Sequence, residues 1–236
     1  HRNMKKKILI IVGSIILAFA ILIGYFVVQD FKQEDLLKEE LDSISEIAYD
    51  YSKHDEIEKM LNRTVTKDDY KKVEKAYKKY ITDIYNNIID INNVINDEEL
   101  TKVLTVENYK NDGPSFIITK SYLNKAMKDL EEYKNKYYEY LTEEKAMSYL
   151  NAKDLDSYYV DFYKNEIVGD IETEKNDTTV KESIESIISL LNASYNVIDY
   201  LSNNKDSWTI ENDTILFDTE KDLNEYNELL AKVIEN

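Results

Sequence analysis

The residues best suited to chemistry in this sequence are one histidine and two carboxylates spaced a helical turn apart. Asp50, His54 and Glu58 occupy positions i, i+4 and i+8, which share one face of a helix. An imidazole and two carboxylates could bind a divalent metal ion, but structural zinc sites usually close their shell with Cys or further His. We therefore predict a solvated helix face, on which His54→Ala changes the free energy of unfolding by less than about 0.5 kcal/mol.

The residue types that most other catalytic mechanisms require are absent or rare in this chain. The chain has no cysteine, and His54 is its only histidine apart from His1. This composition disfavours catalysis by a Cys-His pair or a Ser-His-Asp triad. There is no glycine-rich phosphate loop either. We predict that the protein is not an enzyme, with no catalytic, cofactor-binding or metal-ligating residues and no cofactor.

A cluster of three aspartates raises the question of calcium binding. Asp154, Asp156 and Asp161 lie close together in sequence. An EF-hand loop needs glycine at its sixth position and glutamate at its twelfth, where this run has Tyr159 and Asn165. The cluster is therefore not an EF-hand.

An apolar run near the N-terminus determines on which side of a membrane these residues would lie. Ile8 to Val28 contains no charged residue, and about 21 residues of helix span a hydrocarbon core of about 30 Å. Three lysines at positions 5–7 precede the run and acidic residues follow it. The positive-inside rule thus predicts a cytoplasmic N-terminus (1–7), a transmembrane signal anchor (8–28) and an extracytoplasmic domain (29–236).

A cleaved signal peptide is the competing interpretation of the same run. Ala18-Phe19-Ala20 has the small residues of a cleavage site. The apolar run continues past that point to Val28, which is long for a signal-peptide core. We favour an uncleaved signal anchor, although the sequence does not exclude cleavage after Ala20.

The charge beyond the apolar run limits the possible partners. Four of the 30 basic residues precede the run and no acidic residue does, which leaves 26 basic against 47 acidic residues, a formal charge of −21. A negative charge of this size repels the phosphate backbone of nucleic acids and therefore argues against nucleic-acid binding. Cations and basic partners are compatible with it, although an acidic helical surface is commonly just solvated. The abundance of Lys, Asn, Ile and Tyr, with 4 Gly and 1 Pro, indicates a bacterial genome of low GC content.

Apolar residues at helical spacing predict most of the fold. Leu37, Leu41, Ile44, Ala48 and Tyr51 alternate spacings of four and three, a seam too short for a sustained coiled coil. We favour packing of this seam inside its own bundle over a weak homodimer through residues 37–51. Further helices are predicted at 70–95, 97–104, 115–141, 142–150, 155–168 and 180–201, with a turn at 111–114 and a polar loop at 170–178. Thr66 with Asp69, Ser115 and Thr219 are the predicted caps of the helices at 70–95 and 115–141 and of a last helix, and Gly169 is expected to end the helix at 155–168.

One passage changes its period from helix to strand. Trp208–Glu211 and Thr214–Phe217 alternate apolar and polar residues on either side of Asn212-Asp213, which predicts a β-hairpin at about 208–217. The predicted fold is therefore mainly α: a single-pass transmembrane helix, then an elongated multi-helix bundle in one domain with a small C-terminal hairpin.

The 20 tyrosines are the least ordinary feature of the composition. Several lie at helical spacing, including Tyr133, Tyr137 and Tyr140. Their amphipathic rings suit a bundle core whose hydroxyls reach polar partners, and they also suit a protein-binding surface. The sequence does not separate these two roles.

Together these patterns favour a membrane-anchored, extracytoplasmic, helical binding or scaffolding protein of the bacterial cell envelope, with a protein or peptide partner. One alternative is a ligand-sensing ectodomain, which would need a partner subunit because the cytoplasmic segment has only a few residues. A cell-wall hydrolase is the least favoured alternative, since the nucleophile and metal motifs are missing.

Overall fold

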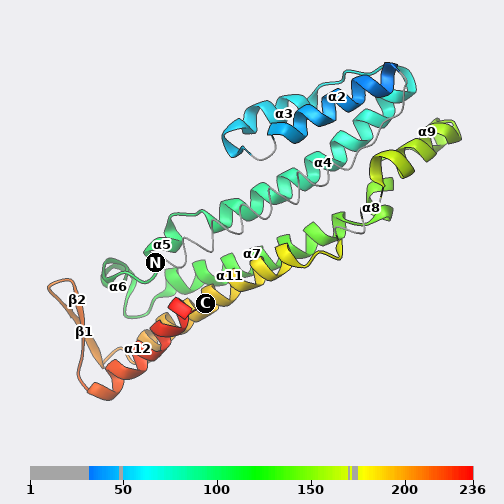
Figure 1. The fold of residues 1–236 in the computed structure, drawn as a ribbon. Coiled ribbons are helices and arrows are strands. Elements are labelled where there is room, and N and C mark those ends of the chain that lie inside the picture. The colour runs from blue at the N-terminus through cyan, green and yellow to red at the C-terminus, as the bar shows by residue number, and fades with distance from the viewer. Residues whose placement is uncertain (1–31, 48–49, 170, 172–174, 236) are drawn as a thin grey trace. The chain divides into compact units, whose positions relative to one another are not determined.

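A computed structural model describes residues 32–47, 50–169, 171 and 175–235 (Figure 1). This part of the chain is mainly helical, with a two-stranded antiparallel sheet near the C-terminus, as the sequence predicts. The apolar run at 8–28 lies outside the described residues. Within them, no helix has both the length and the apolarity to cross a membrane.

The chain divides into two compact units, and the division falls inside helices α4 (Asp68–Ile95), α7 (Ile117–Tyr140) and α11 (Thr179–Asn203). We call the first the hairpin unit; it comprises residues 91–134 and the chain from 181 onward. The second, the pocket unit, comprises the described residues up to 90 together with 135–180.

The hairpin unit is organised around α7 and α11. Its elements are the end of α4, α5 (Glu99–Lys102), α6 (Val106–Asp112), the first part of α7, α11 (Thr179–Asn203), β1 (Trp208–Glu211), β2 (Thr214–Phe217) and α12 (Glu220–Glu235). Ion pairs link Lys120 to Asp199 at 3.1 Å and Lys134 to Glu185 at 3.1 Å. Because the later residue of α7 pairs with the earlier residue of α11, the two helices are antiparallel.

The C-terminal hairpin has the predicted strands and register. Trp208 pairs with Phe217 and Glu211 with Thr214, so the turn consists of two residues. Both turn residues, Asn212 and Asp213, have positive φ (49° and 59°), which asparagine and aspartate tolerate better than most residues. The hairpin prediction is confirmed.

The hairpin is held to the helices through Trp208. Its ring packs against Tyr109 and Phe116 with centroids 6.4 and 6.1 Å apart, and its Nε1 donates to the carbonyl oxygen of Leu201 at 2.9 Å. The indole is buried and its only polar atom is satisfied. An isolated two-stranded hairpin is marginal in water, so this docking accounts for its order.

The pocket unit places several short helices beside the first part of α4. These are α2 (Lys32–Ile47), η1 (Tyr51–Lys53), α3 (His54–Asn62), α8 (Glu143–Met147), η2 (Ala152–Asp154), α9 (Ser157–Phe162) and a π-helix, η3 (Tyr163–Val168). Figure 1 shows α2 and α3 lying alongside each other next to α4. Leu37, Leu41 and Ile44 are buried, so this part of the predicted seam faces the interior. Ala48 lies outside the described residues.

Two predicted helix caps are wrong, because the Thr66 hydroxyl bonds elsewhere and Asp112 takes the place of Ser115. Thr66 does not cap α4; its hydroxyl donates to a buried carboxylate, that of Glu74, at 2.6 Å. Ser115 does not cap α7, because the Asp112 carboxylate accepts the backbone N–H of Thr119 at 2.7 Å.

Other boundaries agree with the sequence. Thr142 caps α8, and Thr219 accepts the N–H of Asp222 at 3.2 Å at the start of α12. Gly169, with φ of 53°, ends the helical run as expected. The predicted helix at 155–168 is divided into α9 and η3, and η2 precedes it. Helix α6 was not predicted, because its last residues belong to the run from Asn111 to Pro114, which resembles a turn. Residues 170 and 172–174 of the predicted loop lie outside the described residues.

The tyrosines occupy both buried and exposed positions. Tyr80 and Tyr163 are completely buried, and their hydroxyls donate to the carbonyl oxygens of Tyr140 (2.6 Å) and Ala146 (2.7 Å). Such phenols tie one helix to the backbone of another. Tyr158, in contrast, is exposed.

Candidate functional site

The histidine cluster forms with a different set of residues from the predicted one. Helix α3 begins at His54, so Asp50 lies before it, where its carboxylate accepts the N–H of Ser52 at 3.0 Å. The hydrogen bonds from Ser52 lower the pKa of Asp50. His54 and Glu58 do come together, and their potential ligand atoms lie within 4.8 Å of those of Asp55. Of the three residues considered from sequence, His54 and Glu58 therefore lie together and Asp50 is not part of the cluster.

Both imidazole nitrogens of His54 already have protein partners. Nδ1 lies 2.6 Å from the hydroxyl of Tyr85, and the two rings stack with centroids 5.5 Å apart. Nε2 lies 3.3 Å from Glu58 Oε1. A metal ion would have to displace one of these contacts, and exposed acidic side chains commonly cluster without binding one. This geometry favours a structural role for His54.

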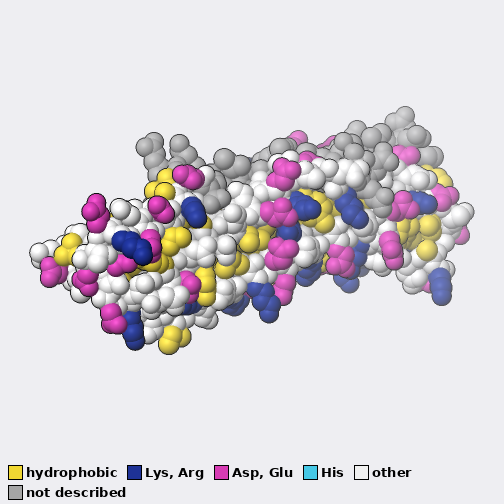
Figure 2. Space-filling view, turned by 90° about the horizontal axis from the view of Figure 1, so that it is seen from below, with side chains coloured by type: hydrophobic (Ala, Val, Ile, Leu, Met, Phe, Trp, Pro, Cys, Tyr) yellow, Lys and Arg dark blue, Asp and Glu magenta, His cyan; other side chains and the backbone are white. Residues whose placement is uncertain are grey.

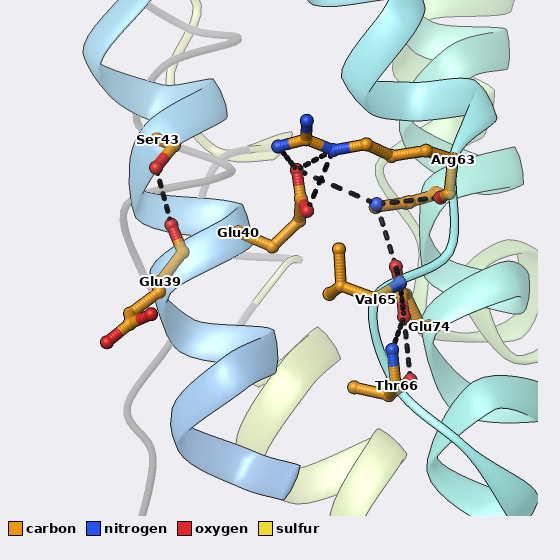
Figure 3. A network of polar contacts seen from close by, with 8 residues as sticks. Glu39, Glu40, Ser43, Arg63, Val65, Thr66 and Glu74 are labelled. Carbon is orange, nitrogen blue, oxygen red and sulfur yellow. Dashed lines mark hydrogen bonds and ion pairs between the residues drawn. The ribbon is translucent and has the colours of Figure 1, made fainter.

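A buried network of charges joins α2, the segment after α3, and α4 (Figure 3). Arg63 donates to the Glu40 carboxylate through Nε at 3.0 Å and through a terminal nitrogen at 2.8 Å. Lys78 lies 2.7 Å from Glu74, which is fully buried. Glu74 also accepts the backbone N–H groups of Val65 (3.0 Å) and Thr66 (2.9 Å).

Hydrogen bonding keeps the Glu74 carboxylate charged. Burial alone would raise its pKa, but the hydrogen bonds from Lys78, Thr66 and Val65 outweigh burial and lower it. Because each charged group here has partners, the network is suited to fixing the segment between α3 and α4 in place rather than to binding a ligand.

A pocket of about 230 Å³ in the pocket unit has a different character. It is lined by side chains from α2, α9 and η3, namely Glu34, Tyr158, Asp161, Phe162, Asn165 and Glu166. Three of the six are carboxylates. We refer to it as the acidic pocket.

Glu34 is the unusual member of the acidic pocket. Only 1% of the residue is exposed. Its Oε1 accepts hydrogen bonds from the hydroxyls of Tyr158 (2.8 Å) and Tyr70 (3.1 Å), whereas Oε2 is buried without a hydrogen-bond partner among the described residues. Burial, followed by the hydrogen bonds with Tyr158 and Glu34, raises the pKa of Tyr70, which keeps this phenol protonated as a donor.

The acidic pocket was not predicted. Glu34 and Tyr158 are 124 residues apart, so no local spacing could have indicated it. Asp161, considered from sequence as part of a calcium cluster, lines this pocket, whereas Asp154 and Asp156 are not among its lining residues.

The hairpin unit carries a second candidate surface at the start of α7. Ile117 and Ile118 are adjacent and are 73% and 74% exposed. They follow Phe116, which is fully buried, so the segment is anchored directly before them. Asp112 also accepts the N–H of Ile118 at 3.4 Å.

One face of the described residues is mixed in charge. Figure 2 shows one face on which acidic and basic side chains are interspersed, with small apolar areas between them. Such a face is typical of solvated helices.

Comparison with known proteins adds no assignment to these sites. No protein-family model matches the sequence, and neither the curated proteins nor the solved structures contain a match.

Proposed function

We propose that this chain is a non-enzymatic, membrane-anchored binding or scaffolding protein of the bacterial cell envelope. In this proposal residues 8–28 form the single-pass anchor, the N-terminus is cytoplasmic and the helical domain is extracytoplasmic. The uncharged apolar run and the lysines before it support this topology.

The exposed pair Ile117 and Ile118 carries the binding role. Complete burial of an isoleucine side chain is favourable by about 1.5–3 kcal/mol, and 73% of Ile117 and 74% of Ile118 are exposed. Single exposed apolar residues are ordinary, but two neighbours on an anchored turn form a ready contact for another protein. The proposed partner is therefore a protein with an apolar recess.

Site-specific crosslinking in the cells that make this protein tests the role. A photoreactive residue at Ser115, next to the isoleucines, should give a discrete crosslinked protein. The variant Ile117→Ser with Ile118→Ser should reduce that product about tenfold, as expected for a loss of about 1.4 kcal/mol. Ile234→Ser, which changes an exposed isoleucine on α12, is the matched control. Equal crosslinking in the double variant and the control would contradict the proposal.

The topology is tested separately with protease. Protease added to intact protoplasts should degrade the helical domain and leave a small N-terminal fragment. Complete protection of the chain would contradict the proposed orientation. The weak homodimer through residues 37–51 stays a prediction, for which sedimentation of the full chain in detergent at increasing concentration is the measurement.

The acidic pocket favours a second candidate function, a ligand-sensing ectodomain that works with a partner subunit. Glu34, which has one buried carboxylate oxygen without a hydrogen-bond partner among the described residues, lines this pocket. A sensor of this kind would change its association with the partner subunit when the pocket is filled.

A further inference from the structure

The acidic pocket lacks positive charge among the described residues. Neither Glu34 nor Asp161 nor Glu166 forms an ion pair within this part of the chain. The first turn of α2, where Glu34 lies, favours its negative charge through the helix dipole. A buried carboxylate oxygen without a partner is costly, so a cationic donor at this position would be stabilising.

The spacing of the carboxylates distinguishes an organic cation from a metal ion. Ligand oxygens around one calcium or magnesium ion lie about 2.0–2.6 Å from it, and hence within about 5 Å of one another. Among the described residues only His54, Asp55 and Glu58 bring their ligand atoms within 4.8 Å; the three pocket carboxylates do not. An elongated cation could reach carboxylates that one metal ion could not.

Two aromatic rings line the same pocket. Tyr158 and Phe162 lie one helical turn apart on α9, with nearly parallel rings (8°) and centroids 6.4 Å apart. Aromatic faces attract cations and also cover alkyl chains. The Tyr158 hydroxyl donates to Glu34 Oε1, so the residue that lines the pocket also holds its buried carboxylate.

The backbone beside the pocket is a π-helix, η3, which includes Asn165 and Glu166. It is marked by the bond from the N–H of Gly169 to the carbonyl oxygen of Lys164, five residues earlier, at 3.0 Å. Short π-helices are rare and frequently occur at functional sites. This places an amide and a carboxylate on an irregular turn next to Glu34.

From these observations we infer that the acidic pocket binds a small aliphatic amine in its ammonium form, with Glu34 Oε2 accepting from the ammonium group. Tyr158 and Phe162 contact the alkyl chain, and Asp161 and Glu166 supply the remaining negative charge. The site lies in the pocket unit and does not depend on the binding role proposed for Ile117 and Ile118.

Calorimetric titration of the full chain in detergent micelles tests the inference, at a fixed ionic strength that screens the acidic surface. The probes are 1,5-diaminopentane, its uncharged counterpart 1,5-pentanediol, and magnesium chloride. We expect saturable binding of the diamine only. Glu34→Gln should weaken it at least about tenfold, whereas Glu56→Gln, which changes an exposed carboxylate on α3 of the same unit, should leave it unchanged.

Two further variants keep the test decisive. Glu166→Gln should weaken diamine binding about threefold and leaves the buried carboxylate of Glu34 in place. This variant still tests the inference if Glu34→Gln disturbs the fold. Tyr158→Leu removes the ring and should also weaken binding, with circular dichroism as the check on folding. The inference is overturned by no diamine binding up to about 10 mM, by equal affinity for the diol, by saturable magnesium binding that Glu34→Gln abolishes, or by equal binding in the Glu34 and Glu56 variants.

Discussion

The hydroxyl oxygens of Tyr109 and Tyr226 lie 3.0 Å apart and join α6 to α12 across 117 residues of sequence. Both side chains are buried. Because each hydroxyl satisfies the other, we expect Tyr109→Phe and Tyr226→Phe each to lower the free energy of unfolding by about 1–2 kcal/mol. Urea denaturation followed by circular dichroism measures the loss.

The double variant distinguishes the hydrogen bond from simple loss of packing. Replacing both tyrosines leaves no unsatisfied hydroxyl, so the combined loss should be smaller than the sum of the two single losses. Strict additivity would show that the two hydroxyls do not interact in solution.

Lys78 and Glu74 form the most deeply buried ion pair described here. Removing one member of such a pair leaves a buried charge, so Lys78→Met should lower the free energy of unfolding by about 3 kcal/mol. The control is Lys102→Met, which removes the exposed partner of Glu99 in an ion pair of 3.2 Å and should have no measurable effect. Similar losses in both variants would contradict the burial of Glu74.

The buried tyrosines predict unfolding at high pH. Burial is the main cause that raises the pKa values of Tyr80, Tyr109 and Tyr163 above the ordinary value of 10.0. The folded chain therefore holds these protons more tightly than the unfolded chain does. Their stabilising contribution is complete below pH 10 and falls as the pH rises above it, by about 1.4 kcal/mol per pH unit for each group.

Phenolate absorbance and helical circular dichroism, recorded together during a titration, check this prediction. Ionisation of the buried tyrosines should coincide with loss of helix, and Tyr163→Phe should make the decline in stability less steep. Complete ionisation near pH 10 with the helix retained would rule out the proposed burial.

His54 provides a prediction that differs from the one made from sequence alone. Its contact with Tyr85 gives His54→Ala an expected loss of about 1 kcal/mol, more than the 0.5 kcal/mol expected for a solvated face. Tyr85→Phe removes the same hydrogen bond and keeps the ring, so its loss should be similar or smaller.

Micromolar zinc should leave the melting temperature unchanged, because both nitrogens of His54 have protein partners. A zinc site at a hundredfold excess over its Kd would add about 2.7 kcal/mol to the folded state. A rise in melting temperature that disappears in His54→Ala would establish a metal site and reopen the hydrolase alternative.

The parts of the fold that follow local rules were predictable. The apolar stripe of α4 repeats at the helical period, and Asn212-Asp213 tolerates the positive φ of a tight hairpin turn. Thr66 and Ser115 have the residue types of caps, yet Glu74 and Asp112 supply competing partners. Such competition depends on tertiary structure and leaves no mark in the local sequence.

The candidate sites were less predictable for the same reason. No local pattern distinguishes Glu34 from the other carboxylates of the sequence, yet only 1% of this residue is exposed and it accepts a hydrogen bond from Tyr158. The pairing of His54 with Glu58 follows from helical spacing, whereas its contact with Tyr85, 31 residues away, does not. Predicting either contact would require the packing of separate helices.

Trp208 is the only tryptophan of the chain, and it lies in the hairpin unit. Its indole is buried and donates to Leu201, so its fluorescence should be blue-shifted in the native protein and shift to the red when this unit opens. Emission from Trp208 therefore reports on the hairpin unit alone. Comparing its melting curve with that of total helix content would reveal whether the pocket unit loses its structure at the same temperature or at another one.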